Sequence, residues 1–153
     1  MHTRMQYSAL VACALLIIPA AAFADNGSTQ ASVQQSYLGA MLARATCQAN
    51  VETGYIGDAI SDISNINQTA ISADSSKISA DLQTLTTDVN NKDQFKVDLK
   101  SFRTDSLSGT LDLRSAIKDA KPTSDEKTKL KSDFNNIRST YKSCMFGAIQ
   151  QSA

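Results

Sequence analysis

The side chains that could support chemistry in this chain of 153 residues are few, and histidine is almost absent. The single histidine is His2, at the start of an apolar segment that we expect to be removed on export. The remaining chain then lacks the commonest general base and the usual ligand of zinc, copper and haem. No Cys-x-x-Cys-His motif is present either, which excludes covalent attachment of a c-type haem. The sequence therefore predicts no metal, haem or other cofactor.

Carboxylates remain the one catalytic option. Five aspartates recur along a stretch with helical periodicity, at a spacing typical of a solvated face: Asp58, Asp62, Asp74, Asp81 and Asp88. The only glutamates are Glu52 and Glu126, so the Glu-x-x-His pairs of a di-iron carboxylate bundle cannot form. With no histidine and no glutamate pair, we expect that the protein is not an enzyme.

Two cysteines, Cys47 and Cys144, lie beyond the N-terminal segment. In an exported protein, two and only two cysteines usually form one disulfide. The alternative is a redox-active or intermolecular thiol. The sequence leaves open whether the two cysteines pair within one chain.

The N-terminal segment has the features of an export signal. Arg4 precedes an apolar run over residues 9–18, and Ala22-Phe23-Ala24 forms an A-x-A cleavage site. The run is shorter than the ~20 apolar residues of a spanning helix. We therefore predict a signal peptide over residues 1–24, cleavage between Ala24 and Asp25, and no stable membrane span afterwards. Lipoprotein processing at Cys13 is a weaker alternative, because apolar sequence continues beyond that cysteine.

Cleavage leaves fourteen basic and fifteen acidic residues. A nearly neutral chain with interspersed charges has no footprint for nucleic acid or an anionic membrane, so another protein or exported partner is the expected ligand. Asn26-Gly27-Ser28 and Asn67-Gln68-Thr69 match the acceptor pattern for N-glycosylation. The pattern is short and often arises by chance, so it matters only in a host that glycosylates exported proteins.

These residues need helices to position them. Residues 25–30 are polar and predict a flexible leader, followed by a single domain over 31–153. Its last segment, Leu130 to Ala148, carries apolar residues at alternating steps of four and three, behind a capping box formed by Thr123 and Glu126. Similar periodicity recurs earlier, with a break at residues 53–57, and no alternating strand pattern occurs. We predict an all-α antiparallel helical bundle of four to five segments without a β-sheet.

The number of segments depends on residues 56–90, which could form one helix or two. Four helices over about 31–52, 56–90, 95–120 and 124–150 would place Cys47 and Cys144 roughly 35 Å apart in height, too far for a disulfide. A turn at Asp74-Ser75-Ser76 brings them level. We therefore favour five helical segments with a Cys47–Cys144 bridge, and a plain four-helix bundle if these cysteines do not pair.

The function that fits these expectations is an exported, periplasmic or extracellular, non-catalytic bundle that acts as a binding or structural module through its surface. The alternative is a small periplasmic helical chaperone or stress sensor, which this chain matches only in size, export and helicity. Tyr37 and Arg44, one helical repeat apart, could contact a ligand. They could equally be a core-edge tyrosine beside an arginine that extends to solvent.

Overall fold

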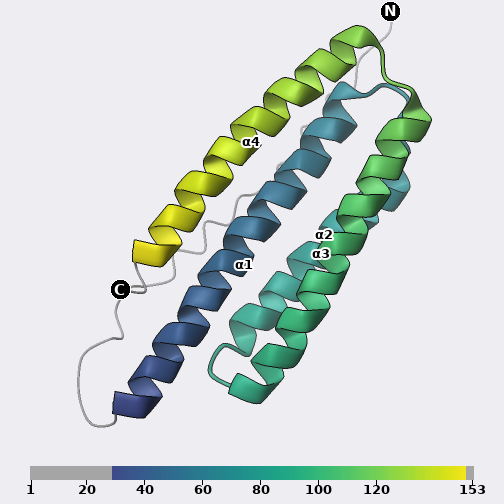
Figure 1. Cartoon of the computed structure of the whole chain (residues 1–153). Helices are drawn as coiled ribbons and strands as arrows, with labels where there is room; N and C mark the ends of the chain where they lie inside the picture. Colours follow the sequence, from purple (N-terminus) through teal and green to yellow (C-terminus); the bar gives the residue numbers. More distant parts are fainter. Residues whose placement is uncertain (1–28, 151–153) are drawn as a thin grey trace, which may run out of the picture.

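The computed structural model describes residues 29–150, with side chains from residue 33 to residue 148. This part of the chain contains no strand and forms four helices, α1 (Thr29–Asp62), α2 (Gln68–Thr87), α3 (Lys92–Ala120) and α4 (Ser124–Gln150). Successive helices run in opposite directions and are joined by short turns (Figure 1). The predicted all-α antiparallel bundle is confirmed.

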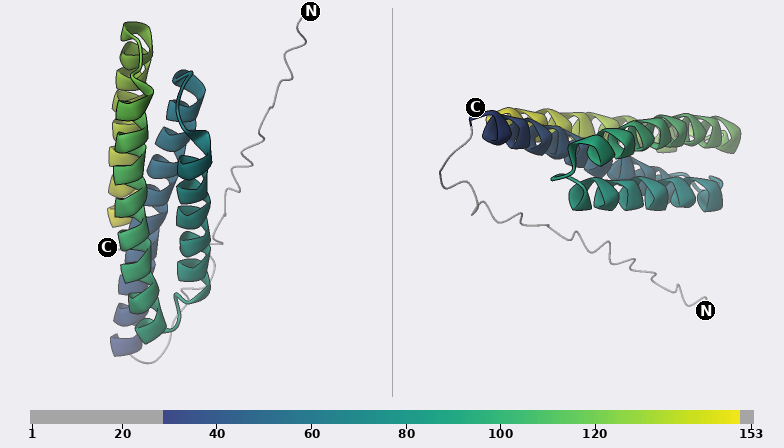
Figure 2. Two further views of the ribbon diagram at one scale, coloured as in Figure 1. Left: turned by 90° about the vertical axis from the view of Figure 1, so that its right-hand side faces the viewer. Right: turned by 90° about the horizontal axis from the view of Figure 1, so that it is seen from below.

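Helix α1 is the centre of the bundle. It packs against α2, α3 and α4, whereas α4 packs closely on α1 alone and α2 pairs with α3. Figure 2 shows α3 and α4 toward one side of α1 and α2 toward the other. Helices α3 and α4 do not pack on each other, so none of the described helices lies over α1 between them (Figure 1).

The predicted helix break at residues 53–57 is wrong, because α1 continues through Gly54 and Gly57 to Asp62. A glycine inside a helix costs about 1 kcal/mol relative to alanine. That cost is outweighed by burial of the apolar positions that follow, since Ile56 and Ile63 are 2% and 1% exposed and a buried isoleucine contributes about 1.5–3 kcal/mol. The turn falls instead at residues 63–67.

The predicted reversal at Asp74-Ser75-Ser76 is also wrong, because α2 is one helix from Gln68 to Thr87. Here the serines bond within the helix and do not cap a new one: the Ser76 hydroxyl donates to the carbonyl of Ser72 over 3.0 Å. Such a bond to the preceding turn lets serine remain inside a helix.

Four uninterrupted helices and a Cys47–Cys144 bridge thus coexist, which the predicted helix bounds had excluded. Cys47 lies mid-way along α1, 15 residues or about 22 Å before its end at Asp62. Cys144 lies 20 residues or about 30 Å into α4. Because α4 begins beyond the end of α1, the two positions come level (Figure 1).

Two local features hold the helices in register. A Cβ on Gly109, which is buried, would lie 3.2 Å from Cβ of Asp74 and 3.3 Å from Cδ1 of Ile78, so α3 continues through this glycine and approaches α2 closely there. At the start of α4 the predicted capping box is present: Glu126 N–H donates to the Thr123 hydroxyl over 3.3 Å, and Thr123 N–H donates to Glu126 Oε2 over 2.7 Å.

The predicted signal peptide, the cleavage between Ala24 and Asp25, the lipoprotein alternative at Cys13 and the acceptor Asn26 all lie outside the described residues. Of the predicted leader, residues 29 and 30 belong to α1. The second acceptor, Asn67, is the exposed residue that precedes α2. Its glycosylation stays a prediction.

Candidate functional site

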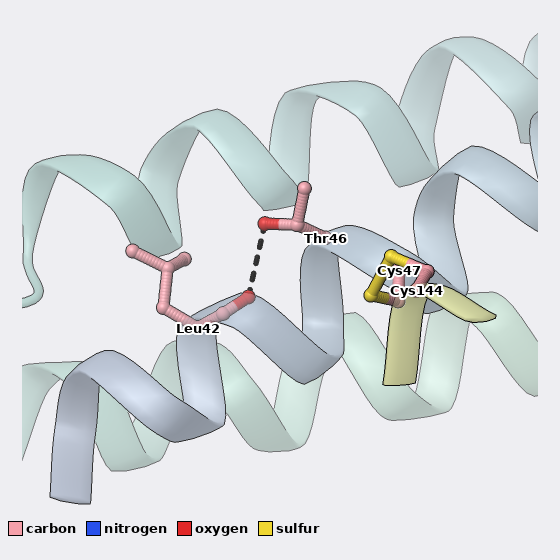
Figure 3. The surroundings of a disulfide bond; sticks show 4 residues. All are labelled: Leu42, Thr46, Cys47 and Cys144. Atoms are coloured by element: carbon pink, nitrogen blue, oxygen red, sulfur yellow. Dashed lines mark hydrogen bonds between the residues drawn. A yellow bond between two sulfur atoms is a disulfide. The ribbon is translucent and has the colours of Figure 1, made fainter. Parts of the chain in front are cut away.

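The two cysteines form a structural cross-link between α1 and α4. Their Cα atoms are 5.8 Å apart and their sulfurs are bonded (Figure 3), so the predicted pairing within one chain is confirmed. Cys47 is 3% exposed. Next to it, the Thr46 hydroxyl donates to the carbonyl of Leu42 over 2.9 Å. A reagent cannot easily reach a sulfur held this deeply, which favours a structural role over a redox one.

The aspartates predicted to form a solvated face lie instead in two half-buried seams. In the first seam, Asp74 and Asp81 of α2 and Asp88, the residue that caps its end, face aspartates of α3. Burial, followed by the neighbouring carboxylates, raises the pKa of each of the three. We call this interface the carboxylate seam; the facing residues of α3 are Asp98, Asp105 and Asp112.

One cation, Lys77, reduces the repulsion between carboxylates in the carboxylate seam. The ammonium group of Lys77 donates to Asp105 over 2.7 Å, and this bond lowers the pKa of the Asp105 carboxyl. Two carboxylate oxygens, Asp81 Oδ2 and Asp98 Oδ2, are buried without a hydrogen-bond partner. Among the described residues, no three acidic, histidine or cysteine side chains are placed to hold a metal ion. The seam is therefore a half-buried acidic interface between α2 and α3, in which three carboxyls have a raised pKa and that of Asp105 has a lowered one.

The second seam joins α1 to α4. Burial raises the pKa of Asp58, and the neighbouring Asp62 adds to the shift. A hydrogen bond with Asp62 raises the pKa of Asp133, which lies on α4. Lys129 lies 3.9 Å from Asp62 and partly offsets this repulsion. Like the first seam, this one is a feature of helix packing.

A third polar group connects α1 to α3 in the interior. Ser106, only 1% exposed, donates its hydroxyl to the Glu52 carboxylate over 2.6 Å and accepts from Gln48 Nε2 over 2.6 Å. Gln48 also donates to Glu52 over 3.0 Å. Every buried polar atom of the trio has a partner, as a packed core requires. These bonds join the middle of α1 to the middle of α3, so the trio fixes the register of the two helices.

The strongest candidate site is the uncovered surface between α3 and α4. Near the turn that joins these helices lies an open hollow of about 740 Å³, in the size range of ligand-binding pockets. Its floor is apolar, and the rings of Tyr55 and Phe134 meet edge to face at a centroid distance of 5.6 Å. Four lysines line it, two on the α3 side and two on α4: Lys118, Lys121, Lys127 and Lys131.

A second hollow lies further along α3, against the first half of α1. Met41, Leu99 and Leu107 supply its apolar surface, and its basic side chains are Lys96, Lys100 and Arg103. Both hollows lie on one stripe of α3, because residues spaced by three or four share a helix face. The stripe runs Lys96, Lys100, Arg103, Leu107, Arg114, Lys118 and Lys121. We call the surface formed by the two hollows, this stripe and the part of α1 between them the basic trough.

The cations of the basic trough form no ion pair, but acidic groups of the second seam lie near its floor, since burial and then the charges of Asp133 and Asp58 raise the pKa of Tyr55. Among the described residues the only ion pairs are Lys77–Asp105 and Lys129–Asp62, and neither lies in the trough. No acidic side chain lines either hollow. A nearly neutral chain thus has a strongly polarised surface, with aspartates on the α2 side of α3 and cations on its other side.

Exposed apolar side chains collect on the same surface. Of seven large ones, Leu107 and Phe134 line the hollows, Leu111 follows one turn after Leu107, and Val33 and Tyr37 fall on the stripe of α1 that includes Tyr55. Only Val97 and Phe146 lie elsewhere. Exposed apolar groups normally scatter over a monomer, so this concentration makes the trough the candidate site.

The structure also places Tyr37 and Arg44, the pair that the sequence suggested could contact a ligand. Tyr37 is 62% exposed and Arg44 is exposed, and both fall on the stripe of α1 that includes Tyr55. This position is compatible with ligand contact and unlike a core edge. Sequence reasoning missed the seven basic residues of the two hollows as a group, although the five on the α3 side include steps of three and four residues that the sequence shows.

Comparison of this chain with protein-family models, with curated proteins and with solved structures finds no significant match. Within residues 29–150, none of the helices is both long and apolar enough to cross a membrane.

Proposed function

We propose that this protein is an exported, non-catalytic helical bundle that binds a partner protein through the basic trough. The observation that carries the proposal is the coincidence of exposed apolar side chains and unpaired cations on one face of the molecule. Apolar area supplies affinity, and unpaired charge supplies selectivity for the partner. Tyr55 and Phe134 are the aromatic anchors that such an interface needs.

Export is supported from two directions. The N-terminal segment has the pattern of a cleaved signal, and disulfides such as Cys47–Cys144 persist in oxidising compartments. We place the protein in the periplasm or outside the cell, with the first 24 residues removed.

Crosslinking from matched phenylalanines tests the proposal. Phe134 and Phe146 both lie on α4 and are 49% and 65% exposed. They are 12 residues apart, which is three full turns and about a third of another, so they lie on different faces of the helix. Replacing each by the photoreactive analogue benzoylphenylalanine leaves the fold nearly unchanged. In the exported fraction of the native host, we expect one defined protein adduct from position 134 and none from position 146.

The adduct must then be identified and the partner purified. Its binding to the wild-type protein should weaken at least about tenfold when Phe134 is replaced by alanine, as expected for an aromatic anchor, and stay unchanged when Phe146 is replaced. Equal crosslinking from both positions, or none from either, would count against the trough as the binding site.

The open apolar floor of the trough also suits a periplasmic chaperone, the alternative function. A chaperone of this kind would bind many unfolded clients and suppress their aggregation at stoichiometric amounts. A selective binding module would not protect a heat-denatured model client. Light scattering of such a client, with and without the protein, separates the two functions.

A further inference from the structure

The shape of the basic trough indicates what kind of partner segment can fill it. From Lys96 to Lys121 the basic stripe spans 25 residues, about 38 Å along α3. Both hollows on this length are open to solvent and floored by apolar side chains. A small apolar ligand would leave one of its faces in water. An α-helix laid along the groove would cover both hollows at once, in the way amphipathic helices occupy hydrophobic grooves.

The charges indicate the composition of that helix. Cations flank the apolar floor on the α3 side and on α4, for example Lys118 opposite Lys131. No acidic side chain lines the hollows, so a bound segment must itself supply the compensating charge. A helix with acidic residues on both flanks of an apolar ridge would match the floor and the two walls.

A second copy of this chain fits the trough less well. The aspartates of α2 and α3 that could form an acidic stripe, such as Asp81 and Asp98, face one another in the carboxylate seam and do not point outward. Binding another copy through them would require the α2–α3 pair to open.

We propose that the basic trough seats an acidic amphipathic α-helix of the partner protein, with its apolar ridge on Tyr55, Phe134 and Leu107 and its carboxylates against the lysines of α3 and α4. This inference rests on the proposed function and specifies which segment of the partner makes the contact.

Three synthetic peptides of about 25 residues, long enough to span the basic stripe, test the inference against the disulfide-bonded chain. The first has leucines on one ridge and glutamates on both flanks. The second replaces the glutamates with lysines, and the third keeps the composition of the first in a scrambled order. By fluorescence anisotropy we expect micromolar binding of the first peptide only, with affinity falling at least tenfold for the other two. Raising the salt concentration from about 50 to about 300 mM should weaken binding of the first peptide.

A matched pair of variants locates the site. The triple variant Lys118→Gln, Lys127→Gln and Lys131→Gln removes three positive charges from the trough. Its control adds three negative charges on the exposed face of α2, by Ser72→Glu, Ser76→Glu and Gln83→Glu. All six positions are exposed, and circular dichroism checks that both proteins fold. Because exposed ion pairs contribute up to about 1 kcal/mol each, we expect about tenfold weaker peptide binding in the first variant and less than a twofold change in the second.

Several outcomes would overturn the inference. Equal binding of the scrambled peptide would show that the trough does not select an amphipathic helix. Equal binding of the lysine peptide would show that it does not select acidic residues. Equal weakening in both variants would show that only net charge matters. Tighter binding of single-stranded DNA or of vesicles rich in phosphatidylglycerol would assign the trough to phosphates. If position 134 crosslinks a partner but the acidic peptide does not bind, the inference fails and the proposed function stands; if both fail, the proposed function fails as well.

Discussion

Removing the disulfide should uncouple α4 from an otherwise intact bundle. Helix α4 packs closely on α1 alone, so the bridge is the only covalent tie that holds its second half in place. The double variant Cys47→Ala and Cys144→Ala breaks this tie without leaving a buried hydroxyl. In this variant the first half of α4 retains the capping box and the Tyr55–Phe134 contact. We therefore expect loss of order mainly beyond residue 137.

The expected magnitude follows from the length of the closed loop. The cysteines are 97 residues apart, and closing a loop of about 100 residues stabilises a fold by about 4.7 kcal/mol in the chain-entropy model. Measured values are often smaller, so we expect a loss of about 3–4 kcal/mol in the free energy of unfolding. Out of a typical total of about 5–15 kcal/mol, that loss is large.

Urea unfolding measures the loss of stability, and hydrogen exchange measures the loss of order in α4. The variant should show a lower urea midpoint, and its amides should exchange faster in α4 than in α2 and α3. The wild-type protein in reductant is the control, because it should match the variant if the bridge, and not the two sulfur atoms, stabilises the fold. A loss below about 1 kcal/mol, far under the loop estimate, would refute this reasoning, as would an equal rise in exchange in all four helices.

Three further predictions concern stability. Replacing Gly109 with valine should cost about 2–3 kcal/mol in urea unfolding, because even a Cβ there crowds α2, whereas Gly57→Ala, with open space around it, should gain up to about 1 kcal/mol; a neutral valine would contradict the close approach. The melting temperature should be higher near pH 4.5 than near pH 7. The reason is that carboxyls such as Asp81 have raised pKa values in the folded chain, which therefore takes up protons before the unfolded chain does as the pH falls. A flat or opposite profile between these pH values would refute this prediction. Glu126→Ala should lower the melting temperature at pH 7, and the difference from wild type should shrink as the pH falls from 4.5, the ordinary pKa of this carboxyl, toward its folded value of about 2; a difference that persists at pH 2 would show that the charge of Glu126 is not the cause.

The lowered pKa of Glu126 has an identifiable cause, which also ties the start of α4 to the turn between α1 and α2. Its carboxylate accepts from the backbone N–H and the hydroxyl of Ser64, each over 2.9 Å, and from Thr123 N–H. Ser64 lies in the turn between α1 and α2, so one side chain caps α4 and fixes that turn. The sequence predicts the cap, because Thr123 and Glu126 are three residues apart. It does not predict the bond to Ser64, which depends on a neighbour 62 residues away.

Several features of the protein follow from the sequence alone, because each depends on neighbours within a few residues or on a simple count. Helical periodicity without strand alternation predicts an all-α bundle, and the Thr123–Glu126 box predicts where α4 begins. Two cysteines behind a segment with the pattern of an export signal predict one bridge. The single histidine, at residue 2, is the basis for expecting no enzyme activity, and that expectation stays a prediction.

Only the tertiary structure decides the rest, because periodicity shows which residues share a helix face but not which neighbour covers that face. Gly54 and Gly57 have weak helix propensity, yet burial of Ile56 and Ile63 carries α1 through them. The aspartates of α2 have the spacing of a solvated face and become half-buried once α3 packs on them. The lysines of α3 and α4 alternate with acidic residues along the chain. They form one basic surface because α3 and α4 both pack beside α1 and leave the space between them open.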